Sequence, residues 1–343
     1  MKRLIRSLGW LGIGLWLVAC SPHPADPARI ASPQAPSGQL VVIAQGSPPD
    51  HKILTLDVET EATETLFAAP EFSQIYQLDV SADGKQLVFA YTPPPTIDTG
   101  FFDRSMLYRL PLDTPEREPE LVLGGTRPQE FYLQPAFSPD GQFLYYTKLA
   151  QDLEAVVTVY RVTLERYDLG SGEILPIAAD GIWPRLSPDG SRLTYIGVDP
   201  TTQARGLFIA APDGSQTQSL VPMGIFFDID SPLFSADGAW VYFSVAKDPP
   251  GISWWEQLLG VKAALAHTEH SVPSDWWRVP VTGGEPEQIT GRAEIIIYGD
   301  LSPTGQHLAY STTNTLYLLN TIDSSLRQIS IRSLSVGVLA WLP

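Results

Sequence analysis

The sequence has few of the residues that build disulfides, metal centres and nucleic-acid interfaces. One cysteine among 343 residues excludes an internal disulfide and a cysteine-based zinc or iron–sulfur site. Lys and Arg number 22 against 38 acidic residues, a net charge of -16, and so acidic a surface argues against binding to a phosphate backbone. Charged residues make up only 17% and hydrophobic residues 44%, which excludes a disordered chain and provides a large core.

Recognisable catalytic motifs are also missing. The chain contains no Gly-x-Ser-x-Gly and no His-Glu-x-x-His. Of the five scattered histidines, His267 and His270 are spaced to share a helical turn as metal ligands, but no third ligand is evident, and solvated loop histidines are the simpler interpretation. We therefore predict no catalytic activity, no cofactor and no metal site.

The N-terminus is typical of an exported lipoprotein. A positively charged start precedes an apolar stretch that is shorter than the roughly 20 residues of a spanning helix, as in a signal peptide. The run Leu17-Val18-Ala19-Cys20 resembles the bacterial lipobox, which implies cleavage before Cys20 and lipidation of its sulfur. A plain signal peptide with a chance cysteine is the alternative. We predict a signal peptide over residues 1–19, a flexible tether rich in Pro, Ala and Ser over 20–37, and a membrane-anchored protein facing the periplasm or the exterior.

Five segments of the remaining chain repeat one pattern. Each has an apolar residue, Ser, Pro or Ala, and Asp-Gly (Thr-Gly in the last), followed by an apolar strand. Asp-Gly between apolar runs indicates a tight hairpin, because Gly adopts positive φ at low cost. Spacings of 48 to 67 residues, with several strands in each, indicate propeller blades. The repeated serines are Ser81, Ser138, Ser187, Ser235 and Ser302.

The two ends of the chain complete one further blade. Residues 39–68 supply strands two to four, and Val338–Pro343 supply a first strand. We therefore predict an all-β, six-bladed propeller of four-stranded antiparallel blades over residues 38–343. The C-terminal strand would close the ring and bury Trp341 between blades.

The Ser-Pro-Asp-Gly repeats resemble the TolB-like, WD-type propeller repeats of bacterial envelope proteins. The resemblance covers roughly residues 38–343 and implies a propeller located in the envelope. TolB itself carries an additional N-terminal α/β domain, whereas only the short tether precedes the blades in this sequence, so a TolB-type role in envelope energisation is not implied.

The turn aspartates Asp83, Asp140, Asp189 and Asp237 are expected to cap their own hairpins, because Asp bonds local backbone N–H groups. Calcium binding is the alternative, but the dense Asp-x-Asp-x-Asp-Gly run of calcium loops is absent.

The longest spacing indicates an insertion, about residues 247–275, in blade five. Ser253-Trp-Trp-Glu256 fits a capping box and predicts a short helix to about His267. The indoles in or beside the insertion either pack on the propeller rim or form an aromatic patch for a partner, a glycan or the bilayer. These residues are Trp254, Trp255, Trp276 and Trp277.

The first strands of a propeller line its central channel. Residues at the beginnings of these strands are expected to pack between blades or to bind a ligand at the channel mouth. The candidates are Tyr132, Trp183, Arg185, Asp228 and Tyr298.

Two functions remain open. The first is a monomeric, lipid-anchored interaction or scaffold module that binds another envelope protein with one propeller face. The second is a channel-mouth binder of a small ligand or oligosaccharide, possibly a lyase. Some TolB-like propellers are similar to oligogalacturonate lyases, but the histidine-rich metal centre of those enzymes has no counterpart in these blades. The sequence names neither partner nor ligand.

Overall fold

A computed structural model of the chain describes residues 36–45, 51–97, 100, 103–114, 118–125, 128–152, 160–246, 273–294, 296–312, 315–329 and 335–343. These residues form twenty-four β-strands and contain no helix, so the all-β class is confirmed. The predicted signal peptide, the tether up to residue 35 and the helix expected around 253–267 lie outside the described residues.

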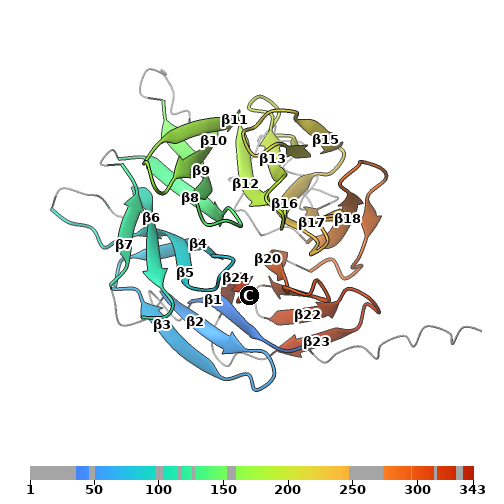
Figure 1. The fold of residues 1–343 in the computed structure, drawn as a ribbon, viewed down its shortest axis with the longest axis horizontal. Coiled ribbons are helices and arrows are strands. Elements are labelled where there is room, and N and C mark those ends of the chain that lie inside the picture. Colours follow the sequence, from blue (N-terminus) through green and yellow to red (C-terminus); the bar gives the residue numbers. More distant parts are fainter. Residues whose placement is uncertain are drawn as a thin grey trace, which may run out of the picture. The chain divides into compact units, whose positions relative to one another are not determined.

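The strands follow one another as antiparallel units of four, arranged around a central axis (Figure 1). Unit one contains β24 (Ser335–Trp341), β1 (Gln39–Gln45), β2 (His51–Asp57) and β3 (Thr63–Ala68). Unit two contains β4 (Gln74–Val80), β5 (Gln86–Thr92), β6 (Arg104–Pro111) and β7 (Glu120–Leu123). Unit three contains β8 (Glu130–Phe137), β9 (Phe143–Gln151), β10 (Tyr160–Asp168) and β11 (Ile174–Ala179). Unit four contains β12 (Gly181–Leu186), β13 (Leu193–Val198), β14 (Arg205–Ala210) and β15 (Gln218–Val221). Unit five contains β16 (Asp228–Phe234), β17 (Trp240–Ala246), β18 (Asp275–Pro280) and β19 (Glu287–Gln288). Unit six contains β20 (Ile296–Leu301), β21 (His307–Thr312), β22 (Leu316–Asn320) and β23 (Leu326–Ile329).

Four of these units are separate four-stranded blades, namely units one, four, five and six. Units two and three share one eight-stranded sheet, because β6 and β8 pair in parallel where Arg104 faces Glu130 and Ser105 faces Phe131. The Ser105 hydroxyl adds to this junction by donating to the Tyr132 carbonyl at 2.9 Å. The propeller of four-stranded antiparallel blades is therefore confirmed, but only four blades are separate sheets where six blades were predicted.

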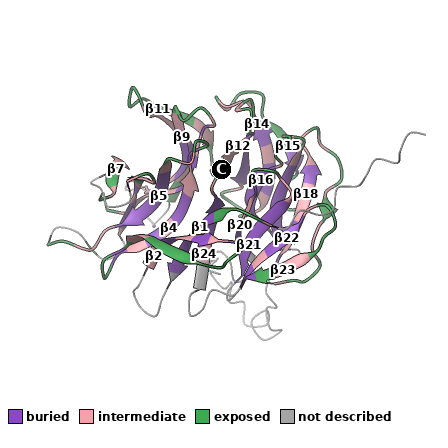
Figure 2. Ribbon diagram, turned by 60° about the horizontal axis from the view of Figure 1, so that its bottom comes forward, coloured by how far each residue is buried: buried purple, intermediate pink, exposed green. Residues whose placement is uncertain are grey.

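Burial falls from the inner strands to the outer ones (Figure 2). The second strands are almost wholly buried, because neighbouring units cover both of their faces; in β5 the residues from Leu87 to Ala90 are 0% exposed. Such strands are continuously apolar rather than alternating. The fourth strands lie at the rim, and most residues of β3 are exposed.

The C-terminal strand completes unit one. β24 pairs antiparallel with β1, and Trp341 lies opposite Leu40. The Trp341 backbone N–H donates to Asp300 Oδ2 at 2.8 Å, and its indole N–H donates to the Asp300 carbonyl at 3.1 Å. Trp341 is only 5% exposed and packs in a cluster that contains residues of units one and six. The predicted ring closure by this strand is therefore observed.

Replacing Trp341 should destabilise the whole propeller. Trp341→Ala removes a buried aromatic ring and two hydrogen bonds, and we expect a loss of about 3–5 kcal/mol in the free energy of unfolding. Trp341→Phe keeps most of the packing and should cost only about 1–2 kcal/mol, mainly through the lost indole bond. Urea unfolding of both variants checks this; an unchanged midpoint for Trp341→Ala would contradict ring closure through this residue.

Candidate functional site

The repeated turns are closed by one pair of side chains. In unit four the Ser187 hydroxyl donates to Asp189 Oδ1 at 2.6 Å, while its oxygen accepts the Arg192 N–H at 2.9 Å. The hydrogen bond from Ser187 and those from Ser191 stabilise the carboxylate and lower the pKa of Asp189 to about 2. The prediction that the aspartates cap their own hairpins is confirmed. Equivalent bonds join Ser81 to Asp83, Ser138 to Asp140 and Ser235 to Asp237, and Thr304 replaces the aspartate beside Ser302.

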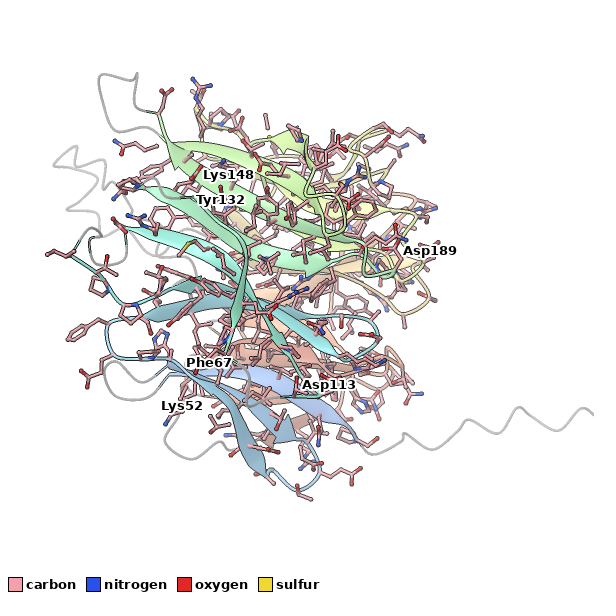
Figure 3. All side chains as sticks on the ribbon, turned by 60° about the vertical axis from the view of Figure 1, so that its left-hand side comes forward. Lys52, Phe67, Asp113, Tyr132, Lys148 and Asp189 are labelled. Atoms are coloured by element: carbon pink, nitrogen blue, oxygen red, sulfur yellow. The ribbon has the colours of Figure 1, made fainter. Side chains whose placement is uncertain are left out.

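These turns lie on one face of the ring, which we call the turn face. Antiparallel pairing puts the connections between strands one and two and between strands three and four on this face, and all other connections on the opposite loop face. Figure 3 shows Asp189 and Asp113 toward one side of the ring and Lys148 and Lys52 toward the other.

The turn face is strongly acidic. Its described connections contain twelve acidic residues but only two cations, Lys85 and Arg192. The described connections of the loop face contain six acidic residues, three of which are ion-paired with arginine. This charge asymmetry is a property of the described connections alone, since residues 46–50, 98–99, 153–159 and 247–272 are not described. The twelve acidic residues are Glu59, Glu61, Asp83, Asp113, Glu118, Asp140, Glu173, Asp189, Asp213, Asp237, Glu285 and Asp323.

Each first strand from β4 to β20 bulges beside the axis, where its register to the second strand shifts. At equivalent bulge positions Gln134, Trp183 and Ser231 have φ of 54°, 56° and 50°. This left-handed backbone is costly for residues other than glycine, and such strain concentrates at functional and structurally over-determined positions.

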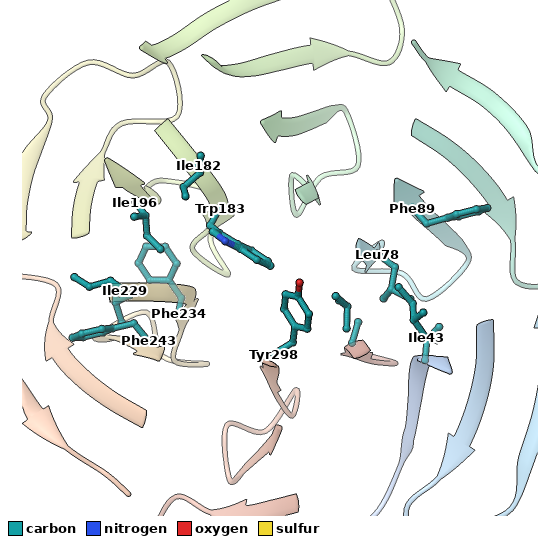
Figure 4. Packing of buried hydrophobic residues seen from close by; sticks show 14 of the residues in the cluster. Ile43, Leu78, Phe89, Ile182, Trp183, Ile196, Ile229, Phe234, Phe243 and Tyr298 are labelled. Carbon is teal, nitrogen blue, oxygen red and sulfur yellow. The ribbon is translucent and has the colours of Figure 1, made fainter. Parts of the chain in front are cut away.

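Side chains at the bulges fill the middle of the channel. The rings of Trp183 and Tyr298 are 5.3 Å apart and are 3% and 8% exposed, and Figure 4 shows both near the axis. Gln134 Oε1 accepts the backbone N–H of Trp183 at 2.9 Å, and Gln77 Oε1 accepts that of Gln134 at 3.2 Å. Trp183 and Tyr298 therefore lie beside the axis, as predicted. Their rings are packed against each other and buried, so they are not open to a ligand.

Three charged side chains converge nearer the turn face. Asp79, Arg185 and Asp300 occupy the same position in their repeats, two residues before the turn serine. Arg185 Nη1 lies 3.5 Å from Asp79 Oδ1 and donates to the Pro135 carbonyl at 3.3 Å. Asp79 Oδ2 accepts the N–H of Phe137 in the next unit at 2.8 Å, just as Asp300 accepts that of Trp341.

A cavity of about 260 Å³ opens from this cluster to the turn face. Arg185 and Asp300 are its charged lining, Leu233 and Phe234 belong to its apolar walls, and the turn residues Pro188, Ala236 and Pro303 form its rim. We call it the mouth cavity. Its mixed lining suits a small group that has an apolar stem and a charged end.

The cluster near the mouth cavity contains two carboxyl groups, those of Asp79 and Asp300, and one guanidinium, that of Arg185. Burial raises the pKa of Asp300 to about 6, against the lowering effects of the Trp341 N–H and Arg185, and nearby Asp79 raises it further. Burial also raises the pKa of Asp79, although Arg185 opposes the shift. Two carboxyl groups thus share one guanidinium in a poorly solvated place, so an additional cation would be stabilised there.

A second charged cluster lies at the loop-face end of β16. Arg205 Nη1 is 2.8 Å from Asp228 Oδ1 and 2.9 Å from Asp230 Oδ1. Burial raises the pKa of Asp230, and Arg205 lowers it. The predicted site residue Asp228 is therefore part of an ion-paired cluster that joins units four and five.

Other predicted binding residues belong to the core. Trp276 is 0% exposed and lies against Gly299, where a Cβ would come within 2.4 Å of the indole; it cannot contact a partner, which corrects the prediction. Tyr132 is 5% exposed, with Lys148 Nζ 5.3 Å from its ring centre. Trp277 is partly buried, 5.2 Å from the Phe226 ring. The candidates Trp254 and Trp255 lie outside the described residues.

Asp79 and Asp300 were not among the predicted site residues. The sequence feature that could have identified them is their equal position in the repeats, two residues before the turn serine. Equivalent positions of successive repeats meet at the axis of a propeller. Among the described residues, no group of three or more His, Cys, Asp or Glu side chains is arranged to hold a metal ion. Within the same part of the chain, no helix has the length and hydrophobicity to cross a membrane.

The pKa of Asp300 predicts a pH-dependent stability. Its pKa is about 6 in the folded protein against 3.8 for the free group, so folding takes up a proton between these values. The stabilisation is complete below pH 3.8 and is lost as the pH rises through 6. The stability of the wild type relative to Asp300→Asn should therefore fall by about 1–2 kcal/mol between pH 4 and 7. Urea unfolding across this range measures the difference; a difference independent of pH would contradict the assignment.

Comparisons with known proteins agree with this architecture. The chain is similar to the crystal structure of TolB from Acinetobacter baumannii, with a TM-score of 0.63 and 17% identity over 89% of this chain and 67% of that one. It is also similar to a nidogen–laminin complex structure (TM-score 0.62, 11% identity, 89% of this chain and 99% of that chain). A putative TolB from Agrobacterium tumefaciens gives a TM-score of 0.57 with 17% identity over 90% of this chain and 100% of that chain.

No protein-family model matches the sequence, and no curated protein matches it. At identities of 11% to 17%, the structural likeness concerns the fold alone. The resemblance to TolB-like propellers that the repeated turns indicated is confirmed at the level of the fold.

Proposed function

We propose that this chain is a lipid-anchored interaction module of the cell envelope that binds a partner protein with its turn face. The observation that carries the proposal is the mouth cavity on this acidic face, which is lined by Asp300 and by Arg185, the guanidinium that also pairs with Asp79. A lysine or arginine of the partner would enter this cavity and supply the missing positive charge, while the surrounding acidic turns would attract a basic surface.

The sequence alone left two roles for the indoles of the tryptophan-rich insertion, packing on the propeller rim and contact with a partner. The end of β17 and the start of β18, between which the insertion falls in the sequence, lie at the loop face. Of its four indoles, Trp276 is buried and Trp277 is partly buried, and Trp254 and Trp255 lie outside the described residues. The charge asymmetry therefore supports the turn face as the binding surface. The carboxyl group in the lining of the mouth cavity, that of Asp300, already accepts the Trp341 N–H.

We also propose that the eight-stranded sheet acts as two blades, which gives a six-bladed ring. Among the described residues, strand pairing between its two four-stranded halves is limited to the two residue pairs at the start of β6 and β8. Each half has its own first strand beside the axis and its own repeated turn.

Partner binding tests the turn face directly. Asp79→Asn combined with Asp300→Asn removes the negative charge of the mouth, and Ala236→Phe fills its rim. Each change should reduce capture of the partner from the native envelope by about tenfold or more. Asp113→Asn combined with Asp323→Asn is the matched control on outer turns and should capture normally. Affinity purification with quantitative mass spectrometry provides the measurement; a partner retained equally by all variants rules out the mouth cavity as the docking site.

Lipid attachment is tested separately. Cys20→Ala should leave the chain unprocessed or release it from membranes, because the acceptor sulfur is lost. Metabolic labelling with a fatty acid, followed by membrane fractionation, compares this variant with the wild type. A wild-type protein that takes up no label would show that the Cys20 motif is not a lipobox.

A further inference from the structure

Successive turns touch one another around the turn face, with one exception. Gly190 faces Pro139 of the preceding turn, to which a Cβ would lie at 3.7 Å. Around Gly141, the equivalent residue of unit three, no atom of another residue lies within 4 Å of the Cβ position. The turns of units two and three are therefore apart. The other contacts join Gly84 to Pro343, Gly238 to Pro188 and Gly305 to Ala236, at 3.5, 4.0 and 3.0 Å.

The gap has a structural cause. Units two and three are joined by the parallel pairing of β6 and β8 at the loop-face ends of these strands. The other neighbouring units pack sheet against sheet. The pairing of β6 and β8 instead holds units two and three together at the loop face and lets their sheets diverge toward the turn face.

A cavity of about 420 Å³ occupies this gap. Val122, Phe137, Leu144 and Leu169 provide an apolar floor that continues into the core between the two units. Ala82 and the turn aspartates Asp83 and Asp140 stand at its rim. The volume is within the range of about 300–1,000 Å³ of ligand-binding pockets. We call this cavity the two–three cleft.

The rim of the cleft is negatively charged. Asp83 stays ionised, because hydrogen bonds from Ser81 and from the Lys85 backbone lower its pKa. Arg109 is the only cation among the described residues of the lining, and its Nε and Nη2 both bond Glu120 Oε2, at 3.0 and 2.8 Å. Lys85 is exposed, so its charge is screened by water. An apolar floor below a negative rim is complementary to an apolar side chain next to a basic one.

We infer that the two–three cleft binds a peptide segment of the partner in which a large apolar side chain is adjacent to lysine or arginine. The apolar side chain would replace water on the floor, and the basic one would approach Asp83 and Asp140. This inference rests on the proposed function, since it specifies the chemistry of the partner at a second site of the turn face.

Three matched peptides test the cleft. The probe is Gly-Lys-Phe-Lys-Gly; Gly-Glu-Phe-Glu-Gly reverses the charge, and Gly-Lys-Ser-Lys-Gly removes the apolar anchor. Each is titrated into the full-length protein while the amide resonance of Gly141 is followed by NMR. Only the first peptide should give saturable shifts. Equal shifts with the charge-reversed peptide, or no shift with the first, would overturn the inference.

Two alanine variants separate this site from the mouth cavity. Ala82 and Ala236 occupy equivalent turn positions, but Ala82 lines the cleft and Ala236 lines the mouth cavity. Ala82→Phe should weaken binding of the lysine–phenylalanine peptide by about tenfold or more, whereas Ala236→Phe should leave it unchanged. Unchanged melting temperatures confirm that both variants fold, and an equal effect of both on the peptide contradicts a specific cleft.

The outcomes also separate the inference from the proposed function. If the peptide binds the cleft but Ala82→Phe and Ala236→Phe both capture the partner normally, the cleft is real and docking through the turn face is wrong. If Ala236→Phe abolishes capture while Ala82→Phe affects neither capture nor the peptide, the proposed function stands and the inference fails.

Discussion

Side-chain oxygens that accept backbone N–H groups from the next unit hold this ring together. The bulge in each first strand interrupts its own ladder, and a buried N–H without a partner is costly. Neighbouring units supply the acceptors: Gln77 for Gln134, Gln134 for Trp183, Asp79 for Phe137 and Asp300 for Trp341. Because the acceptor and the donor come from different units, the bonds form only when the units are correctly placed. The placement of neighbouring units and the closure of the ring therefore depend on the same few polar side chains.

The same bonds prepare the proposed binding site. Carboxylates accept N–H groups well, but at Asp79 and Asp300 this role brings two acidic groups to the axis with only Arg185 between them. The equivalent positions of the other units are Ala136, Leu233 and Ala340, so the charge at the mouth is a property of this sequence and not of the fold. The burial that raises the pKa of Asp300 would also strengthen the attraction of its ionised carboxylate to a cation.

Departures from the repeat create both cavities. Regular contacts between neighbouring turns close most of the turn face, as at Gly190 and Pro139. The two–three cleft appears where β6 and β8 pair directly, and the mouth cavity appears beside charged residues of the first strands. A propeller thus keeps its architecture while single units vary, which is how one fold carries many functions.

The sequence by itself determined the turns, the four-stranded units and the closing strand. Those features depend on local patterns, such as Asp-Gly between apolar runs, and on a repeat that recurs along the chain. Only the tertiary structure decided which aromatic residues are buried, as at Trp276, and which charges meet, as at Asp79, Arg185 and Asp300, or that units two and three share a sheet. These outcomes depend on contacts between residues 23 to more than 200 positions apart, and no local pattern encodes such contacts because they follow from how the units pack around the axis.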